Sequence, residues 1–187
     1  DGDVIDLGEG TVGRAQISDI KGCNCQKKSK LVSVSSGSGF FISTKGDLVT
    51  NNHVVEHCGR IDVQKDGQIY EATVLATDKV NDLALLSSGI ATSDYLHVGE
   101  EKPQLLEDVF VAGFPFGNYV SASLKVTKGI VSSLSGLRNN FSNIQIDAAL
   151  QPGNSGGPIV NEKGNAVGVA VAKLDLETIV EKYGVVP

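Results

Sequence analysis

Two histidines and a glutamate lie close together in the stretch NNHVVEHCG, residues 51–59. His53, Glu56 and His57 match H-x-x-E-H, an inverted zinc-peptidase motif in which two histidines hold the metal and the glutamate activates water. A single histidine that acts as a general base needs neither His57 nor a metal. The stretch by itself therefore leaves two kinds of chemistry open, a zinc site and a proton relay to a nucleophile.

A serine surrounded by glycines, Ser155 in QPGNSGGP at residues 151–158, is the candidate nucleophile. Glycine permits the tight turn that exposes a hydroxyl group. In the stretch Gly153, Asn154 and Ser155, the backbone amides of Gly153 and Ser155 can converge on one point and form an oxyanion hole. A glycine-rich turn without function is the competing interpretation. The order His53, Asp82, Ser155 favours catalysis, because it is the chymotrypsin order of base, carboxylate and nucleophile.

Each member of this set has a defined role. His53 would accept the Ser155 proton and later donate it to the leaving amine, and Asp82 would hold the imidazole tautomer and stabilise the imidazolium. Asp82 directly precedes the apolar stretch LALL, whereas Asp78 lies in the turn-like TDKVN and is expected to be a turn aspartate. His97, in DYLHVG, has no partner motif and is expected to be a loop histidine.

The elements that must position these residues are short β-rich stretches between turn signals. They run from GFFIS at residue 39 to AVGVAVA at residue 166, and this rhythm predicts an all-β barrel or sandwich. Glycine-containing turns are expected at residues 65–68 and 162–165. The strand pattern is lost over residues 88–107, the expected joint between two halves. One helix is expected at residues 175–183, capped by Asp175 and ended by Gly184.

Composition and charge exclude several classes of function. A net charge of −6 with a pI near 5.0 argues against nucleic-acid binding, which needs clustered cations. The one basic cluster, Lys27, Lys28 and Lys30, is expected to be a solvated loop. The sequence has no run of 18 apolar residues, so no membrane span is expected. No cofactor and no metal ligand are expected, because base, nucleophile and oxyanion donors are all present in the chain.

The three cysteines allow one internal disulfide, from Cys23 or Cys25 to Cys58. The three cysteines and one histidine could also supply four zinc ligands. However, C-x-C is not the usual spacing of structural zinc sites. We therefore give the disulfide interpretation precedence and keep zinc as the alternative.

Several of these motifs together resemble the protease domain of the HtrA family of trypsin-like serine peptidases. The resemblance rests on TNNHVV, NDLALL, VAGFPFG, VTKGIVSSL and IQIDAALQPGNSGGPIVN, and it runs from about Ser36 to Ala172. It implies a chymotrypsin-type fold of two six-stranded antiparallel β-barrels with a short C-terminal helix. The whole chain, 1–187, would be one protease domain, with barrels at about 1–95 and about 100–187 and no PDZ domain. The family's base, carboxylate and nucleophile fall on His53, Asp82 and Ser155.

The resemblance also implies a function. We expect a serine endopeptidase that cleaves unfolded or misfolded proteins in protein quality control, in the periplasm or otherwise outside the cytoplasm, as a homotrimer. Two alternatives stay open, a zinc metallopeptidase using HVVEH and a non-catalytic binding or chaperone module of trypsin-like fold. The first is separated by chelator and the second by covalent labelling of Ser155.

The resemblance assigns the specificity pocket as well. Its walls would be Ala149 and Leu150 on one side and Val169, Ala170 and Val171 on the other. A buried cationic substrate side chain would be unpaired there, so cleavage is expected after small or medium aliphatic residues. The helix at 175–183 is expected beside the cleft. The resemblance also implies a resting state in which the oxyanion hole around residues 151–154 is collapsed, and Arg138 lies in the segment that resembles the family's sensor loop.

Overall fold

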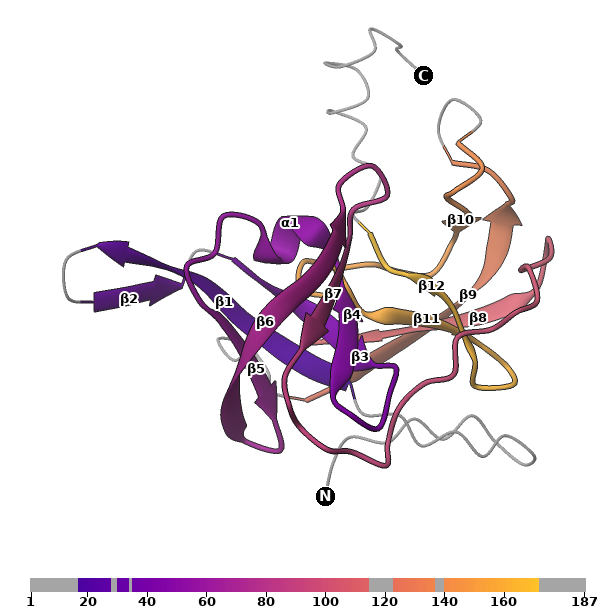
Figure 1. Ribbon diagram of the computed structural model, residues 1–187. Helices are drawn as coiled ribbons and strands as arrows, with labels where there is room; N and C mark the ends of the chain where they lie inside the picture. The colour runs from indigo at the N-terminus through magenta and orange to yellow at the C-terminus, as the bar shows by residue number, and fades with distance from the viewer. Residues whose placement is uncertain (1–16, 28–29, 34, 115–122, 137–139, 172–187) are drawn as a thin grey trace, which may run out of the picture.

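The computed structural model describes residues 17–27, 30–33, 35–114, 123–136 and 140–171, and its architecture is almost entirely β (Figure 1). The side chains of residues 17–33 are not described. The helix expected at 175–183 and the segment around Arg138 lie outside the described residues. No helix in this part of the chain is long and apolar enough to cross a membrane.

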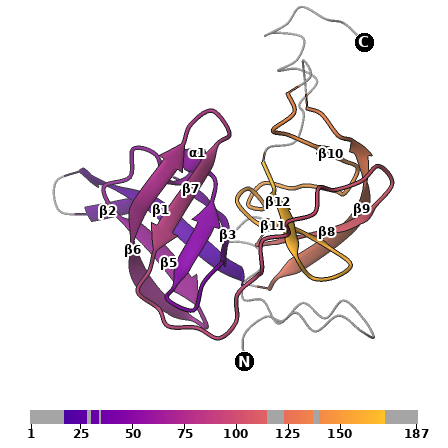
Figure 2. The same cartoon turned by 45° about the vertical axis from the view of Figure 1, so that its right-hand side comes forward.

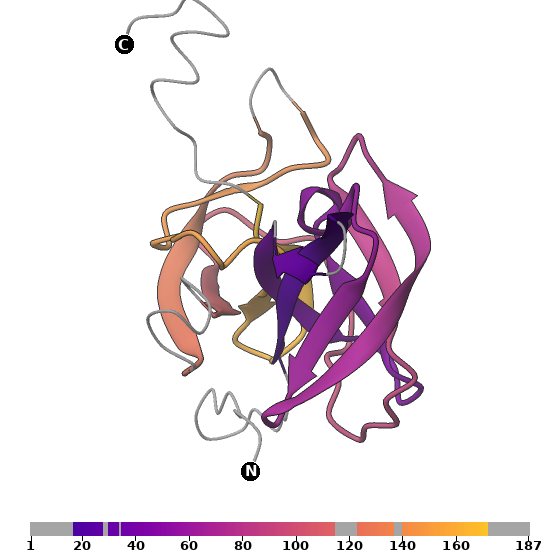
Figure 3. The same cartoon turned by 90° about the vertical axis from the view of Figure 1, so that its left-hand side faces the viewer.

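The first half of the chain forms a curled antiparallel sheet that closes on itself. Its strand order is β2-β1-β3-β4-β7-β6-β5, and β1 also pairs with β5. Six strands therefore make a closed ring, while β2 pairs only with the far end of β1 and projects from the barrel as a hairpin (Figures 1 and 3). The strands are β1 Ile17–Lys27, β2 Lys30–Ser33, β3 Ser36–Phe41, β4 Asp47–Thr50, β5 Ile61–Lys65, β6 Gln68–Asp78 and β7 Leu83–Ser87.

Alternating burial explains why this sheet curls around a core. In β4 and β7 every second side chain points inward, so that Leu48 and Leu86 lie in the barrel with no exposed surface. The turn between β5 and β6 has Asp66 at φ 51° and Gly67 at φ 76°, which is the geometry of a two-residue hairpin turn and confirms the turn expected at 65–68.

The basic cluster differs from its prediction as a solvated loop. Lys27 ends β1, Lys30 begins β2, and the two are paired in the antiparallel ladder. The stretch from Gln26 to Lys30 consists of polar residues only, so the sequence pattern gave no signal for this hairpin.

The second half forms a five-stranded antiparallel sheet among the described residues, with the order β10-β9-β8-β11-β12 (Figure 2). Its apolar cluster includes Val109, Val111, Val131 and Ile159. The turn at 162–165 is confirmed: Asn161 Oδ1 accepts the amides of Lys163 and Asn165, and Gly164 has φ 79°. The strands are β8 Asp108–Gly113, β9 Lys125–Ser133, β10 Gln145–Ile146, β11 Pro158–Asn161 and β12 Ala166–Val169.

The two sheets meet along an apolar seam. Phe40 of β3 packs with Ala112 of β8 and Val160 of β11 in one buried cluster. Residues 88–107 connect β7 to β8 and contain no strand. They contact the sheets through an isolated bridge between Val98 and Ala166 and through single backbone hydrogen bonds, such as that from the Leu96 amide to the Phe41 carbonyl at 2.9 Å. Two curled antiparallel sheets joined in this way confirm the expected all-β, chymotrypsin-type fold. The first has the expected ring of six strands, and five strands of the second are described.

Candidate active site

His53 lies on a single helical turn, α1 Asn52–Val55, directly after β4. Val54 and Val55 are buried in the core of the first barrel, and Asn52 is buried as well. Because these three side chains hold the turn, the His53 side chain is left facing outward, with 43% of its surface exposed. A packed turn of this kind holds a histidine in place while leaving its ring accessible.

Asp82 holds this histidine from the residue before β7. His53 Nδ1 lies 2.6 Å from Asp82 Oδ2, and the His53 backbone amide donates to Asp82 Oδ1 at 2.8 Å. The Asp82 carbonyl oxygen accepts from Asn51 Nδ2 at 2.9 Å and from the Asn52 amide at 3.1 Å. The side-chain carboxylate and the backbone carbonyl of Asp82 are therefore both hydrogen-bonded to the histidine turn or to the residue before it. With Nδ1 occupied by the carboxylate, Nε2 is the ring nitrogen available for proton transfer.

Asp82 needs an unusual backbone conformation, and the loop before it supplies one. Its φ is 55°, in the left-handed region that aspartate and asparagine tolerate better than most residues. Asp78 accepts from the amides of Val80 and Asn81 and from Asn81 Nδ2. The backbone hydrogen bond from Asn81 is the largest cause that lowers the pKa of Asp78. Asp78 is thus the turn aspartate that the sequence predicts.

Ser155 lies in a tight loop between β10 and β11. Gly153 has φ 99° and Gly156 has φ 86°, conformations that favour glycine. The Asn154 amide donates to the Gln151 carbonyl at 3.0 Å, and the Gly156 amide donates to the Ala170 carbonyl at 2.8 Å. Within the described residues, the amides of Gly153 and Ser155 have no protein acceptor. Two unpaired donors therefore flank Asn154 in a loop that is otherwise fixed by hydrogen bonds.

The seam between the barrels brings the serine loop next to the histidine turn. A Cβ added to Gly37 of β3 would lie 2.7 Å from Val54 Cγ2 and 2.8 Å from the Ser155 carbonyl oxygen. Val54, the residue after His53, and the backbone of Ser155 therefore approach the same side of one glycine. The histidine turn and the backbone of the serine loop therefore lie next to each other at the seam, although their segments are far apart in the sequence.

The residues predicted to form the specificity pocket are only partly brought together. Leu150 and Ala170 pack in the same apolar cluster of the second barrel, beside the buried Ala148. Val169 packs in the seam cluster instead. Ala149 is exposed, and its carbonyl oxygen accepts from Thr127 Oγ1 at 2.9 Å. Val171 is half-buried next to Ala170.

The geometry of His53, Glu56 and His57 does not match the zinc motif. The motif needs a helix that continues through both histidines, but α1 ends at Val55 and Glu56 is extended, with ψ 144°. His57 follows at φ 62°, with 87% of its side chain exposed. Among the described residues, no three histidine, cysteine, aspartate or glutamate side chains are grouped to hold a metal ion.

Cys58 is disulfide-bonded, which agrees with the expected bridge to Cys23 or Cys25, the other two cysteines of the chain. Cys23 of β1 is paired with Ile61 of β5, so that its backbone runs beside the start of the strand that follows Cys58. A sulfur in a disulfide is not a thiolate and cannot serve as a zinc ligand. The bridge also lies three residues after the histidine turn and ties that segment to the barrel.

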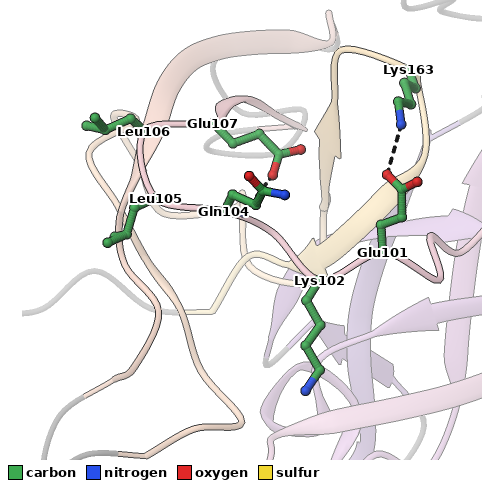
Figure 4. Close-up of a pocket in the computed structure, with 7 residues that line it drawn as sticks. All are labelled: Glu101, Lys102, Gln104, Leu105, Leu106, Glu107 and Lys163. Atoms are coloured by element: carbon green, nitrogen blue, oxygen red, sulfur yellow. Dashed lines mark hydrogen bonds and ion pairs between the residues drawn. The ribbon is translucent and has the colours of Figure 1, made fainter.

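A separate shallow pocket lies on the connection between the sheets, near the β11–β12 turn (Figure 4). Lys163 Nζ pairs with Glu101 Oε2 at 2.8 Å, and the pairing lowers the pKa of Glu101. Leu105 and Leu106 point away from this ion pair. No histidine, serine or cysteine lines this pocket, so it contains no second candidate for the base or the nucleophile of a serine peptidase.

Two residues next to the site were not predicted from the sequence. Asn51 and Asn52 bind the Asp82 carbonyl, and both stand in TNNHVV immediately before the histidine. Asn51 could have been identified from the sequence, since a side-chain amide close to a candidate base can bind the loop opposite. Asn52 binds through its backbone amide, and its side-chain amide donates to Glu56 Oε2 at 3.1 Å. Burial of both side chains makes this role structural rather than chemical.

Comparisons with known proteins agree with this geometry. A family model described as a trypsin-like peptidase domain matches residues 37–169. The "Uncharacterized protein y4bJ" of Sinorhizobium fredii is 43% identical over 154 residues, which are 82% of this chain and 24% of that protein. The "Probable periplasmic serine endoprotease DegP-like" of Chlamydia pneumoniae is 40% identical over 142 residues, 73% of this chain and 28% of that protein.

Among solved structures, the serine endoprotease from Yersinia pestis superposes with a TM-score of 0.65 at 29% identity. The match covers 82% of this chain and 52% of that chain. This chain spans about a quarter of the length of the two curated relatives.

Proposed function

This chain belongs to the trypsin-like peptidase family, and from that premise we propose that it is a serine endopeptidase of the HtrA type. The observation that carries the proposal is the 2.6 Å contact between His53 Nδ1 and Asp82 Oδ2, beside the loop that presents Ser155. A carboxylate on Nδ1 leaves Nε2 to act as the general base. The trypsin-like family assignment and the DegP-like relative support the same chemistry.

In the proposed reaction, Ser155 Oγ attacks the carbonyl carbon of the scissile bond while its proton moves to His53 Nε2. The Oγ–C bond forms, and the carbonyl electron pair moves onto oxygen. The tetrahedral intermediate then collapses, the C–N bond breaks, and His53 gives its proton to the leaving amine. Water attacks the resulting acyl-enzyme by the same steps in reverse order, which regenerates Ser155.

The oxyanion of each tetrahedral intermediate would be bound in the segment Gly153, Asn154 and Ser155. The amides of Gly153 and Ser155 are the donors, and among the described residues neither has a competing protein acceptor. Donors that are fixed before the reaction stabilise the developing charge without reorganising. Their availability supports a loop that is ready for catalysis rather than the collapsed state expected for a resting enzyme.

We propose that cleavage follows small or medium aliphatic residues. Leu150 and Ala170 belong to one apolar cluster, and the side chain of Ala149 offers no countercharge. A methylene group buried in such a pocket contributes about 0.8 kcal/mol, whereas an unpaired buried cation costs several kcal/mol. Cleavage-site profiling in a denatured protein mixture tests this, with a Ser155→Ala variant as the blank. A majority of Lys, Arg, Asp or Glu before the cut would overturn it.

Unfolded or misfolded proteins are the proposed substrates, because their apolar segments are accessible to such a pocket. The name of the Chlamydia pneumoniae relative includes "periplasmic", and it supports an extracytoplasmic location for this protein too. A homotrimer is proposed on the family resemblance alone. Sedimentation of the purified protein tests the assembly, and a single monomeric species at micromolar concentration would contradict it.

The reaction class is tested by two treatments of the same degradation assay. We expect Ser155→Ala to abolish cleavage of a denatured protein, and a metal chelator to leave the wild-type rate unchanged. Activity lost to chelator and retained by Ser155→Ala would indicate metal chemistry. Binding of the denatured protein with no cleavage by the wild type would indicate a non-catalytic module.

A further inference from the structure

Ser38 is a fully buried serine of the first barrel that reaches into the serine loop of the second. Its side-chain Oγ donates to the Gly153 carbonyl oxygen at 2.7 Å, across 115 residues of sequence. Its backbone amide donates to the Ser155 carbonyl oxygen at 2.8 Å. The two residues whose amides are the proposed oxyanion donors are therefore both held, through their carbonyl groups, by one serine.

Two further hydrogen bonds hold Ser38 itself in place. Its Oγ accepts the backbone amide of Phe114, just after β8, at 2.9 Å. Its carbonyl oxygen accepts from Thr50 Oγ1, at the end of β4, at 2.8 Å. Thr50 is also fully buried and stands three residues before His53. Ser38 thus connects the strand that leads to the histidine with the loop that carries the nucleophile.

No space is left around this serine for a substitute partner. A Cβ added to Gly113 would lie 2.9 Å from Ser38 Oγ, and a Cβ added to Gly156 would lie 2.2 Å from the Ser38 carbonyl oxygen. Loss of the hydroxyl would remove the partner that the Gly153 carbonyl and the Phe114 amide share in this packed site. The Gly153 carbonyl group is therefore held by this one hydroxyl, in addition to the hydrogen bonds that fix the rest of the loop.

We propose that Ser38 is a positioning residue that fixes the direction of the Gly153 and Ser155 amides in the oxyanion hole. This inference rests on the proposed function. Gly153 has no side chain to restrict its backbone, and its φ of 99° is one of several conformations open to glycine. The Ser38 hydrogen bond selects this one. Without it, the loop can rotate its peptide groups away from the oxyanion.

The test compares Ser38→Ala with the wild type on a peptide substrate. We expect kcat to fall about 10- to 100-fold with KM changed less than about threefold, since loss of a whole oxyanion donor costs about 10²- to 10³-fold and here the donor is only misdirected. A peptide boronic acid, which forms a tetrahedral anion on the serine, should lose affinity in parallel with kcat. A product peptide, which forms no such anion, should bind as before.

Ser88 provides a matched control in the first barrel. Its Oγ also donates to a glycine carbonyl, that of Gly46 at 2.9 Å, and accepts a backbone amide, that of Ile90 at 3.3 Å. Gly46 has φ 88°, so the local chemistry is the same. Ser88 holds a turn before β4 and not the serine loop. Ser88→Ala should lower the melting temperature but leave kcat and boronate affinity within about threefold of the wild type.

If Ser38→Ala does not fold, Thr50→Val is the second variant. It has nearly the same shape and removes only the hydrogen bond to the Ser38 carbonyl oxygen. We expect the same pattern in weaker form, with kcat and boronate affinity lowered together, by about threefold or more, and KM unchanged. Wild-type kcat in this variant would then overturn the proposal.

The outcomes separate this inference from the proposed function. Activity retained by Ser155→Ala overturns both. An inactive Ser155→Ala, together with a Ser38→Ala variant whose kcat matches that of Ser88→Ala, overturns the positioning role and leaves the proposed function in place. A parallel loss of product-peptide affinity in Ser38→Ala would also overturn it, because the change would then be structural.

Discussion

Replacement of Asp82 by asparagine tests how the carboxylate acts on His53. Asparagine has the same shape and tolerates the left-handed φ of 55°, so the backbone should not change. Its Oδ1 can still accept the His53 amide, which Asp82 holds at 2.8 Å. The side-chain NH₂ group, however, would replace Oδ2 at 2.6 Å from Nδ1. The ring must then accept at Nδ1 and carry its proton on Nε2, where it cannot take the proton of Ser155.

Two explanations of the Asp82 contact predict different losses of kcat for Asp82→Asn. If the carboxylate only orients the ring, loss of one charged hydrogen bond costs about 1.5–3 kcal/mol, or roughly 10- to 100-fold in rate. If it selects the tautomer, the same change in the triad template lowers kcat about 10⁴-fold, or about 5.4 kcal/mol. We expect the larger loss, with KM changed little.

The assay is steady-state cleavage of a peptide with an aliphatic residue before the scissile bond. Asp78→Asn is the control, because Asp78 lies in the same loop and binds the loop backbone instead of His53. It should keep kcat within about threefold of the wild type, as expected for a surface substitution. An Asp82→Asn variant that melts like the wild type and keeps more than about a hundredth of kcat would refute the tautomer argument.

Three other predictions concern stability. Hydrogen bonds lower the pKa of Asp78, so the stabilising effect of its carboxylate should be present above the unfolded pKa near 4 and lost as the pH falls through the lower folded pKa. The difference in melting temperature between wild type and Asp78→Ala should therefore vanish in acid. A difference that grows in acid would contradict this. Gly156→Ala should destabilise the protein by roughly 3 kcal/mol or more in chemical denaturation, because its Cβ would lie 2.2 Å from a main-chain oxygen. Gly67→Ala, at φ 76° with open space around it, should cost about 1–2 kcal/mol. Equal costs for the two variants would refute the packing argument. Leu86→Ala, at a side chain with no exposed surface, should lower the free energy of unfolding by about 2–5 kcal/mol. Leu105→Ala, at a residue with 55% of its surface exposed, should lower it by less than about 0.5 kcal/mol. Similar denaturation midpoints for the two variants would show that the barrel core is not where we place it.

The chemistry of the site could be predicted from the sequence because its signals are local. The aspartate before an apolar strand, the histidine after TNN and the serine among glycines each stand in a short motif. Their order along the chain selected one mechanism. The zinc alternative arose because a motif written in letters assumes a continuous helix. In the structure the helical turn ends at Val55. Val54 and Val55 are both buried in the core, and the next residue, Glu56, is already extended.

The role of Ser38 could not be predicted from the sequence. In SSGSGFF it resembles a turn serine, and its side-chain partner is 115 residues away. Only the packing of the two sheets against each other brings Ser38 and Gly153 together. The β1–β2 hairpin was missed for a related reason. Its two strands pair in an antiparallel ladder, and the polar run from Gln26 to Lys30 lacks the alternation that predicts strands.

The most direct test of the central claim is covalent labelling by a fluorophosphonate, followed by peptide mass spectrometry. This reagent modifies a serine only where a base and an oxyanion hole activate it. We predict one adduct per chain, on Ser155, lost in Ser155→Ala and strongly slowed in His53→Ala. The absence of any adduct on a folded protein, or an adduct on a different serine, would contradict the account.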